Sequence, residues 1–220
     1  DQSQMTHYWD CCKESCAWAD SPSIMKSCDI TGKSSSGQSV DDPSRCDDGS
    51  ETMCKNRYPW IGDGSNGDKG VLYGYVAADQ SQGKTNCGTC WELEFENGKT
   101  AKVQQTNLGG VNGIFDFAVP GGGFGDFNGC KDMDGWTVYT DDNGPCHPTK
   151  DNSDCHVFGG LNDKSGCAKA FPGDPDAQAS CENILLNTDY FPTGDNFPGN
   201  PVIKRMRSIS CPKELTENTG

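Results

Sequence analysis

Short runs of alternating or β-branched apolar residues, each bounded by turn residues, set the pattern of this chain. They predict strands at 71–78, 90–96, 99–106, 114–119, 136–140 and 202–210. Asn97-Gly98 lies between the second and third runs and predicts a hairpin, because both residues tolerate positive φ. Helical signals are weaker and predict short helices at 12–17 and 176–186. We therefore expect a mainly β fold whose six strands close into a barrel, which removes exposed edges.

Two long segments between these runs are too polar to pack alone. Residues 21–68 and 141–201 are rich in Gly, Pro, Ser, Asn and Asp, and the chain contains 28 glycines and 12 prolines. This composition argues against a helical bundle. A chain of 220 residues is long enough for one sizeable core, so we expect a single domain over residues 1–220.

Cysteines supply the means to order these polar segments. There are fourteen, an even number spread over nearly the whole chain, which is typical of disulfides in a secreted protein. Each bridge contributes about 2–4 kcal/mol to stability. Spacing alone leaves the pairing open. Cys87 and Cys90 form a lone C-x-x-C, and the Cys146-His147 and Cys155-His156 steps lack zinc-site spacing, so we expect no metal.

The net charge of the chain limits the classes of partner that it can bind. A net charge of −14 argues against a nucleic-acid partner, because proteins that bind nucleic acids need clustered Lys and Arg. A neutral or basic ligand fits better. The chain opens at Asp1 on polar residues, and no apolar run approaches membrane-spanning length. We expect a mature, soluble, extracellular form with no membrane partner.

The first candidate for chemistry is Asp10, in the stretch "THYWDCCKESCAW" at 6–18. Trp9 precedes it and Trp18 follows closely, and aromatic faces beside a carboxylate suit sugar recognition, because a pyranose ring offers an apolar face and hydroxyls. On local grounds the simpler interpretation is that both tryptophans lie in the core and Asp10 caps a helix at 12–17. Both interpretations remain open at this level.

The second candidate is Asp116, which interrupts the apolar run "GIFDFAVPGGGFGDF". Phe115 and Phe117 flank it, and a carboxyl group beside aromatic surfaces favours its protonated form. An equally good interpretation places Asp116 on an edge strand, facing water. Two carboxylates with aromatic neighbours suit glycoside hydrolysis, in which one protonates the leaving oxygen and the other activates water or attacks the sugar.

Other catalytic arrangements fit less well. A serine hydrolase would need a G-x-S-x-G turn, and an aspartic protease would need paired Asp-Thr-Gly or Asp-Ser-Gly segments; neither is present. The three histidines, His7, His147 and His156, are expected on the surface or in loops rather than as a catalytic set.

Several motifs together resemble glycoside hydrolase family 45, the small secreted endoglucanases. They are "THYWDCCKESCAW", "CGTCWELEF", "VQQTN", "FDFAVPGGGFGDFNGC" and a terminal "SCPKEL", and the match runs from residue 6 to about residue 215. The resemblance implies a six-stranded double-psi β-barrel with long disulfide-stapled loops and a few short helices. It also implies endo-acting, inverting hydrolysis of internal β-1,4-glucosidic bonds in cellulose, with mixed-linkage glucan or glucomannan as further substrates. We expect a monomeric catalytic domain that needs no cofactor and carries no carbohydrate-binding module.

By this resemblance, Asp10 matches the family's general base and Asp116 its general acid. Positions expected to contact the glucan are Thr6, Tyr8, Trp18, Asp195 and Asn196. The resemblance also implies seven disulfides: Cys11 with Cys130, Cys12 with Cys46, Cys16 with Cys87, Cys28 with Cys54, Cys90 with Cys211, Cys167 with Cys181, and Cys146 with Cys155.

The sequence departs from the family in the loop before the acid. Residues 107–113 contain no carboxylate, where many members carry an aspartate, and Ile114 stands where they have a histidine. Asn107, Asn112 or water must then do the work of that aspartate. The main rival function is non-hydrolytic, expansin-like polysaccharide binding; expansin-like proteins lack an equivalent of the base, so Asp10 discriminates. A barwin-type defence protein would share the barrel but would not need the loops that carry Trp18 and Asp195.

Overall fold

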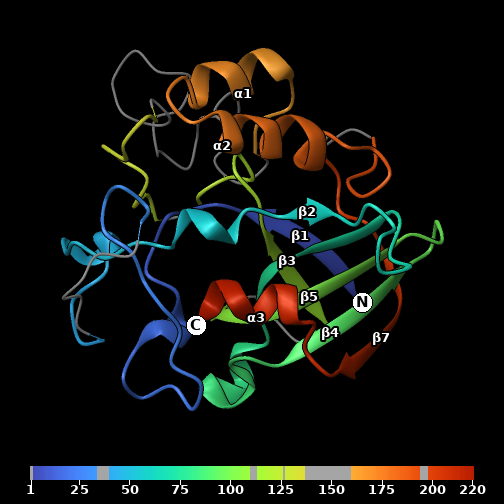
Figure 1. Ribbon diagram of the computed structural model, residues 1–220, viewed down its shortest axis with the longest axis horizontal. Coiled ribbons are helices and arrows are strands. Elements are labelled where there is room, and N and C mark those ends of the chain that lie inside the picture. Colours follow the sequence, from blue (N-terminus) through green and yellow to red (C-terminus); the bar gives the residue numbers. More distant parts are fainter. Residues whose placement is uncertain (1, 34–39, 110–112, 126, 137–159, 194–197) are drawn as a thin grey trace.

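The protein folds around a seven-stranded sheet in this computed structural model, which describes residues 2–33, 40–109, 113–125, 127–136, 160–193 and 198–220 (Figure 1). Its strands are β1 (Gln4–Tyr8), β2 (Trp60–Ile61), β3 (Val71–Ala78), β4 (Cys90–Phe95), β5 (Thr100–Leu108), β6 (Ile114–Ala118) and β7 (Ile203–Ile209). Six of them are neighbours in the order β1-β6-β3-β5-β4-β7, and β2 pairs with β3 outside this path.

The six-stranded path returns to its start. An antiparallel bridge joins Gln4 of β1 to Val202, directly before β7. The Met5 N–H donates to the Pro201 carbonyl, and the Ile203 N–H donates to that of Ser3. Two of the pairings, β1 with β6 and β3 with β5, are parallel. The predicted mainly β barrel is confirmed.

Five of the six predicted strands are present. The sixth, 136–140, falls almost entirely on residues outside the described ranges; Trp136 itself is buried and belongs to no strand. The strands β1 and β2 were not predicted. In β1 only Met5 is aliphatic, so its extended state comes from pairing with β6 rather than from its own pattern.

The helices lie in two places on the barrel. In Figure 1, α1 (Lys164–Ala170) and α2 (Pro175–Ser180) lie together above the barrel, while α3 (Lys213–Thr219) packs against β3 and β5. The predicted helix 176–186 corresponds to α2 and the π-helical turn η6 (Cys181–Leu185). The predicted helix 12–17 is reduced to a single 3₁₀ turn, η1 (Ser15–Ala17). Further 3₁₀ turns are η2 (Arg45–Asp47), η3 (Lys55–Arg57) and η4 (Gln80–Asn86).

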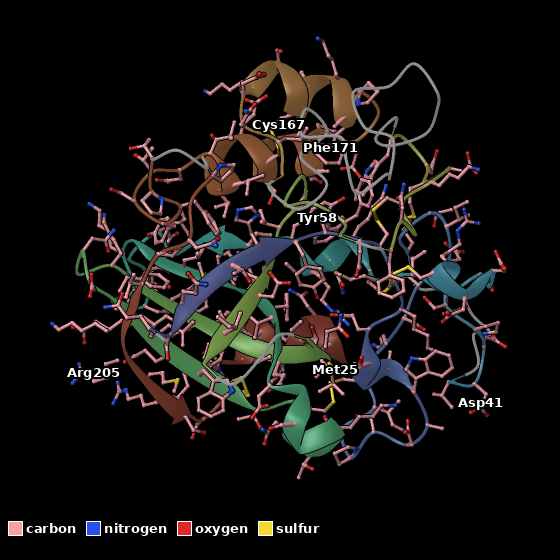
Figure 2. All side chains as sticks on the ribbon, turned by 180° about the vertical axis from the view of Figure 1, so that it is seen from behind. Met25, Asp41, Tyr58, Cys167, Phe171 and Arg205 are labelled. Carbon is pink, nitrogen blue, oxygen red and sulfur yellow. A yellow bond between two sulfur atoms is a disulfide. The ribbon has the colours of Figure 1, made fainter. Side chains whose placement is uncertain are left out.

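An aromatic cluster joins the helical layer to the barrel. The ring of Trp136 lies 4.8 Å from that of Phe171, and Trp9 lies between Trp136 and Tyr58 at 6.1 and 5.5 Å. Figure 2 shows Phe171 in the helical layer and Tyr58 below it, nearer the barrel. Asp174 accepts hydrogen bonds from the Tyr58 hydroxyl and the Trp136 indole, which satisfies the buried polar ends of these two rings.

Six disulfides tie the loops to this framework. They join Cys11 to Cys130, Cys12 to Cys46, Cys16 to Cys87, Cys28 to Cys54, Cys90 to Cys211 and Cys167 to Cys181. These are six of the pairs that the family resemblance implied. The expected seventh, Cys146 with Cys155, lies outside the described residues.

A buried ion pair fixes the chain just beyond β1. Arg57 donates to the Glu14 carboxylate at 3.1 Å, with side-chain exposures of 0% and 1%. Its guanidinium also donates to the carbonyls of Lys26 and Asn218. A buried charge without its partner is far more costly than a buried pair. The pair therefore fixes the position of Glu14, two residues after the adjacent cysteines.

We expect Arg57→Met to lower the free energy of unfolding by about 3–5 kcal/mol, because it leaves the Glu14 carboxylate buried without a counter-charge. Adding Glu14→Gln should recover part of this loss, which chemical denaturation of the single and double variants would measure. The control is Arg205→Met: Arg205 projects from β7 (Figure 2) with its side chain 71% exposed and pairs with Glu94. That change should cost less than about 1 kcal/mol; an equal cost for both arginines would contradict the assignment.

Candidate active site

Asp116 lies on β6, an inner strand of the barrel. The pairing of β6 with both β1 and β3 sets Asp116 beside Thr6 and Ala77. The Thr6 hydroxyl donates to Oδ1 of Asp116 at 2.7 Å. The alternative that Asp116 faces water on an edge strand is therefore wrong. Thr6, predicted to contact substrate, thus uses its hydroxyl group to donate a hydrogen bond to the Asp116 carboxyl group.

The surroundings of Asp116 favour its protonated form. Burial raises the pKa of this carboxyl above its usual value, and the Thr6 hydrogen bond and the nearby His7 act against that rise. The side chains of Phe115 and Phe117 on either side in sequence are 5% and 0% exposed. Because burial outweighs the two opposing interactions, Asp116 keeps its proton to a higher pH than a free aspartic acid.

Asp10 follows β1, and hydrogen bonds and a disulfide fix the backbone around it. Its carbonyl accepts from the Gly129 N–H at 2.8 Å, and the Trp9 N–H before it donates to the Gly123 carbonyl at 2.6 Å. The next residue, Cys11, has φ 58°, a left-handed conformation that is uncommon for a residue with a side chain. Cys11 is also disulfide-bonded to Cys130, one residue after Gly129. The position of Asp10 is thus fixed by strand, turn and disulfide together.

The Asp10 side chain turns back onto the chain instead of capping a helix. Its Oδ1 accepts from the Cys12 N–H at 2.9 Å, and η1 begins later, with Glu14 at its N-cap. The helix-cap interpretation is therefore wrong. Burial raises the pKa of Asp10 to about 7, helped by repulsion from Asp116 and Glu14 and opposed by the Cys12 hydrogen bond.

The structure brings the two predicted catalytic carboxyl groups to one site: Asp116 is paired with Thr6, four residues before Asp10, and its charge helps to raise the pKa of Asp10. They come from segments more than 100 residues apart, at the end of β1 and in the middle of β6. Since they repel each other when both are ionised, they lose their protons in succession as the pH rises, and between the two steps the pair holds a single proton.

Tyr8 and Asn107 are linked behind this site. Asn107 donates to the Tyr8 hydroxyl at 3.3 Å, and its side-chain oxygen accepts from the Ser15 N–H and hydroxyl. Tyr8 and Asn107 are each 8% exposed. Asn107, considered from the sequence as a replacement for the missing loop aspartate, instead joins β5 to η1 and to β1. The residues of this loop at 110–112 lie outside the described part of the chain.

Trp18, directly after η1, is held by a cation. The Lys13 ammonium lies 4.0 Å from the centre of the indole and donates to the carbonyls of Val40 and Asp42 at 2.8 Å each. Trp18 is half-buried, whereas Trp9 is 2% exposed and belongs to the core cluster. Because Lys13 covers one face of Trp18, stacking on a sugar would use the other face. Sequence reasoning missed Lys13, whose spacing of five residues from Trp18 gave no signal.

Asp195 and Asn196, expected to contact substrate, lie outside the described residues. Within the described ranges, no three His, Cys, Asp or Glu side chains group as metal ligands would. The same part of the chain holds no helix with the length and apolar character to cross a membrane.

Comparison with known proteins places this site in a family. The sequence model of glycosyl hydrolase family 45 matches residues 2–220. An endoglucanase from Cryptopygus antarcticus is 31% identical over 226 residues, covering 97% of this chain and 86% of that protein. Endoglucanase B from Cellvibrio japonicus (strain Ueda107) is 38% identical over 239 residues, covering 98% of this chain but 44% of that protein, so the chain spans less than half its length.

The fold has a matching solved structure. The crystal structure of a cellulase from the Antarctic springtail Cryptopygus antarcticus superposes with a TM-score of 0.75 at 28% identity, covering 99% of this chain and 95% of that chain. The two folds thus match over nearly the full length of both chains.

We expect Asp10→Asn to raise the melting temperature at pH 8 by a few °C and to change it little at pH 4. The pKa of Asp10 is higher in the folded than in the unfolded chain, so the stability that this carboxyl contributes at low pH is lost as the pH rises from about 4 to about 7. Asparagine is neutral at both pH values and keeps the oxygen that accepts from Cys12. Thermal unfolding followed by circular dichroism measures the effect.

The control for this prediction is Asp63→Asn. Hydrogen bonds from Ser65 lower the pKa of Asp63, so its replacement should not stabilise the protein at pH 8. An Asp10→Asn melting temperature that shifted equally at pH 4 and pH 8 would contradict the burial of Asp10.

Proposed function

The chain belongs to glycosyl hydrolase family 45, and from this membership and the paired carboxyl groups we propose that it is a secreted endo-β-1,4-glucanase that inverts the anomeric centre. The observation that carries the proposal is the convergence of Asp10 and Asp116, from distant segments, on one site where Asp116 pairs with Thr6 and its charge helps to raise the pKa of Asp10. Relatives named endoglucanase that match nearly the whole of this chain support it.

In this mechanism Asp116 is the general acid. The Thr6 hydroxyl occupies Oδ1, and the hydrogen bonds of the described residues leave Oδ2 for the reactant. A proton on Oδ2 passes to the glycosidic oxygen as the bond from that oxygen to the anomeric carbon breaks. Burial among phenylalanines keeps the proton in place until then, because it raises the pKa of the carboxyl.

Asp10 is the general base, and it acts on the opposite side of the sugar from Asp116. Its Oδ1 is held by the Cys12 N–H, and among the hydrogen bonds of the described residues Oδ2 stays available to accept a proton from water. That water attacks the anomeric carbon on the face opposite the departing oxygen, which inverts the configuration. After the reaction Asp10 carries the proton and Asp116 is ionised, so exchange with solvent restores the pair.

The active form is the one in which the pair holds a single proton, on Asp116. The mutual repulsion keeps this singly protonated state populated over a wider pH range than two independent carboxyls would allow. Both pKa values lie above the usual aspartate value, and that of Asp10 is about 7. The base acts only when ionised, so activity is expected to rise as the pH approaches the Asp10 pKa of about 7, and to fall once Asp116 loses its proton.

The substrate class follows from the charge and the aromatic surface. A net charge of −14 disfavours anionic polymers, and a neutral β-glucan carries no charge to be repelled. The half-buried Trp18 offers a flat face to a sugar ring. We propose cellulose as the substrate, with mixed-linkage glucan or glucomannan as further substrates, and a monomeric extracellular enzyme stabilised by its disulfides.

We expect the protein to lower the viscosity of soluble carboxymethylcellulose faster than it releases reducing ends, because internal cleavage shortens chains before it frees small sugars. Asp116→Asn and Asp10→Asn should each lower kcat by about 10²–10⁴-fold, as expected for loss of a general acid or base. The matched control is Asp189→Asn, an exposed carboxylate paired with Lys99. Wild-type rates in either site variant would overturn its role, and binding to cellulose without release of reducing ends would favour an expansin-like function instead.

A further inference from the structure

His7 lies on β1 between Thr6 and Tyr8, so strand alternation directs its side chain to the opposite side from theirs. It is 7% exposed, and its ring meets that of Phe191 edge-on at 5.4 Å. The expectation that the histidines lie on the surface or in loops is therefore wrong for His7. The proposed reaction leaves this buried titratable group without a function.

Both ring nitrogens of His7 face carbonyl oxygens. Nδ1 lies 2.7 Å from the Gly122 oxygen, and Nε2 lies 3.0 Å from the Pro198 oxygen. A carbonyl oxygen only accepts hydrogen bonds, and a neutral imidazole has a single N–H. In a neutral ring, one nitrogen would therefore point its lone pair at the lone pairs of a carbonyl oxygen, which is repulsive. Both are satisfied when the ring is an imidazolium, and the bonds are then the stronger, charge-assisted kind.

The Gly122 carbonyl belongs to the turn that follows the acid strand β6. The Gly122 N–H donates to the Val119 carbonyl at 2.8 Å. A Cβ at Gly122 would lie 2.9 Å from the Tyr8 nitrogen, so only glycine lets this turn approach β1 so closely. The next residue, Gly123, accepts from the Trp9 N–H. The turn thus contacts the backbone of Tyr8 and Trp9, the two residues directly before Asp10.

The Pro198 carbonyl belongs to the segment that leads into β7. The Gly199 N–H donates to the Pro192 carbonyl at 3.0 Å, and the Met5 N–H donates to the Pro201 carbonyl. Phe191, at the start of this segment, packs on both His7 and Phe117. His7 is therefore the side chain that joins the turn behind the acid to the segment on the other side of β1.

We propose that His7 is a buried imidazolium and a positioning residue, which joins the glycine turn after β6 to the Pro198 segment. This inference deepens the proposed function and rests on it. On β6, Phe117 is in register with His7, while the Asp116 carboxyl lies with Thr6 on the other side of the strand and interacts with His7 through its charge alone. The turn and the Pro198 segment present carbonyl oxygens to His7, and Phe191 presents an aromatic ring.

The charge of His7 also acts on the acid, without a direct contact. It lowers the pKa of Asp116 and so partly offsets the effect of burial. Without it Asp116 would hold its proton more tightly and to higher pH. Loss of the cation should therefore move the pH optimum of hydrolysis upward, whereas loss of a purely structural contact would leave the optimum in place.

The test compares three variants with the wild type on a soluble cello-oligosaccharide. His7→Gln removes the charge and one donor, and His7→Arg keeps a cation with several donors. Tyr75→Phe is the control, because Tyr75 is a fully buried barrel residue whose hydroxyl likewise donates to a carbonyl, that of Leu215. Melting temperature and near-ultraviolet circular dichroism confirm that each variant is folded.

We expect His7→Gln to lower kcat by roughly tenfold or more, through displacement of the acid by a fraction of an ångström, with a smaller change in KM. Its pH optimum should rise, while His7→Arg should retain the wild-type optimum and most of the activity. Tyr75→Phe should leave kcat and the optimum unchanged. A His7→Gln profile with the wild-type optimum would overturn the proposal.

A second measurement needs neither activity nor a folded variant. In the free wild-type protein at pH 7, nuclear magnetic resonance should show two slowly exchanging ring N–H protons for His7. A single ring N–H would contradict the imidazolium. If the wild type hydrolysed no glucan but showed both protons, the proposed function would fail while the charge state of His7 stood.

Discussion

At Cys11 the backbone takes a left-handed turn with φ 58°, and the geometry of the site depends on that turn. A residue with a side chain gives up about 1–2 kcal/mol in this conformation. The turn persists because Cys11 and Cys12 are bonded to different parts of the chain, Cys130 and Cys46. The adjacent Asp10 is thereby held with its carbonyl on Gly129 and its carboxyl on the Cys12 N–H. A catalytic group that must meet its partner across a sugar tolerates little displacement, and this clamp limits it.

The second half of the site depends on register. The parallel pairing of β1 with β6 sets Thr6 beside Asp116, and a slip of one residue would turn the acid to the other side of the sheet. β1 has little apolar content of its own. Its register is therefore set by two contacts with the rest of the barrel, the burial of Met5 in the core and the bridge from Gln4 to Val202. His7 adds contacts from the opposite side of the same strand. The acid and the base are thus positioned by one short strand and by what is bonded to it.

Much of the barrel could be predicted from the sequence because five of its strands carry strong apolar runs. β1 could not, since its alternate positions are polar and it becomes a strand only through long-range pairing. The chemical types and sequence context pointed to Asp10 and Asp116. Local reasoning nevertheless favoured a helix cap for Asp10 and left an edge strand as an equal alternative for Asp116. What decides between them is the distance in space between residues 10 and 116, which no local pattern contains. Lys13 and His7 were missed for the same reason: their partners, the carbonyls of Val40, Asp42, Gly122 and Pro198, are backbone atoms that leave no trace in residue identity.

The central claim is that the two carboxyl groups act from opposite faces of the sugar, one on water and one on the departing oxygen. It is tested most directly by the configuration of the first product. Proton nuclear magnetic resonance of a short β-1,4-glucan, recorded within the first minutes after adding the enzyme and before mutarotation, would follow the newly formed reducing end. The account predicts the α-anomer first, with the β-anomer growing in later. Immediate appearance of the β-anomer would mean retention, and would contradict the assignment of Asp10 as a base acting through water.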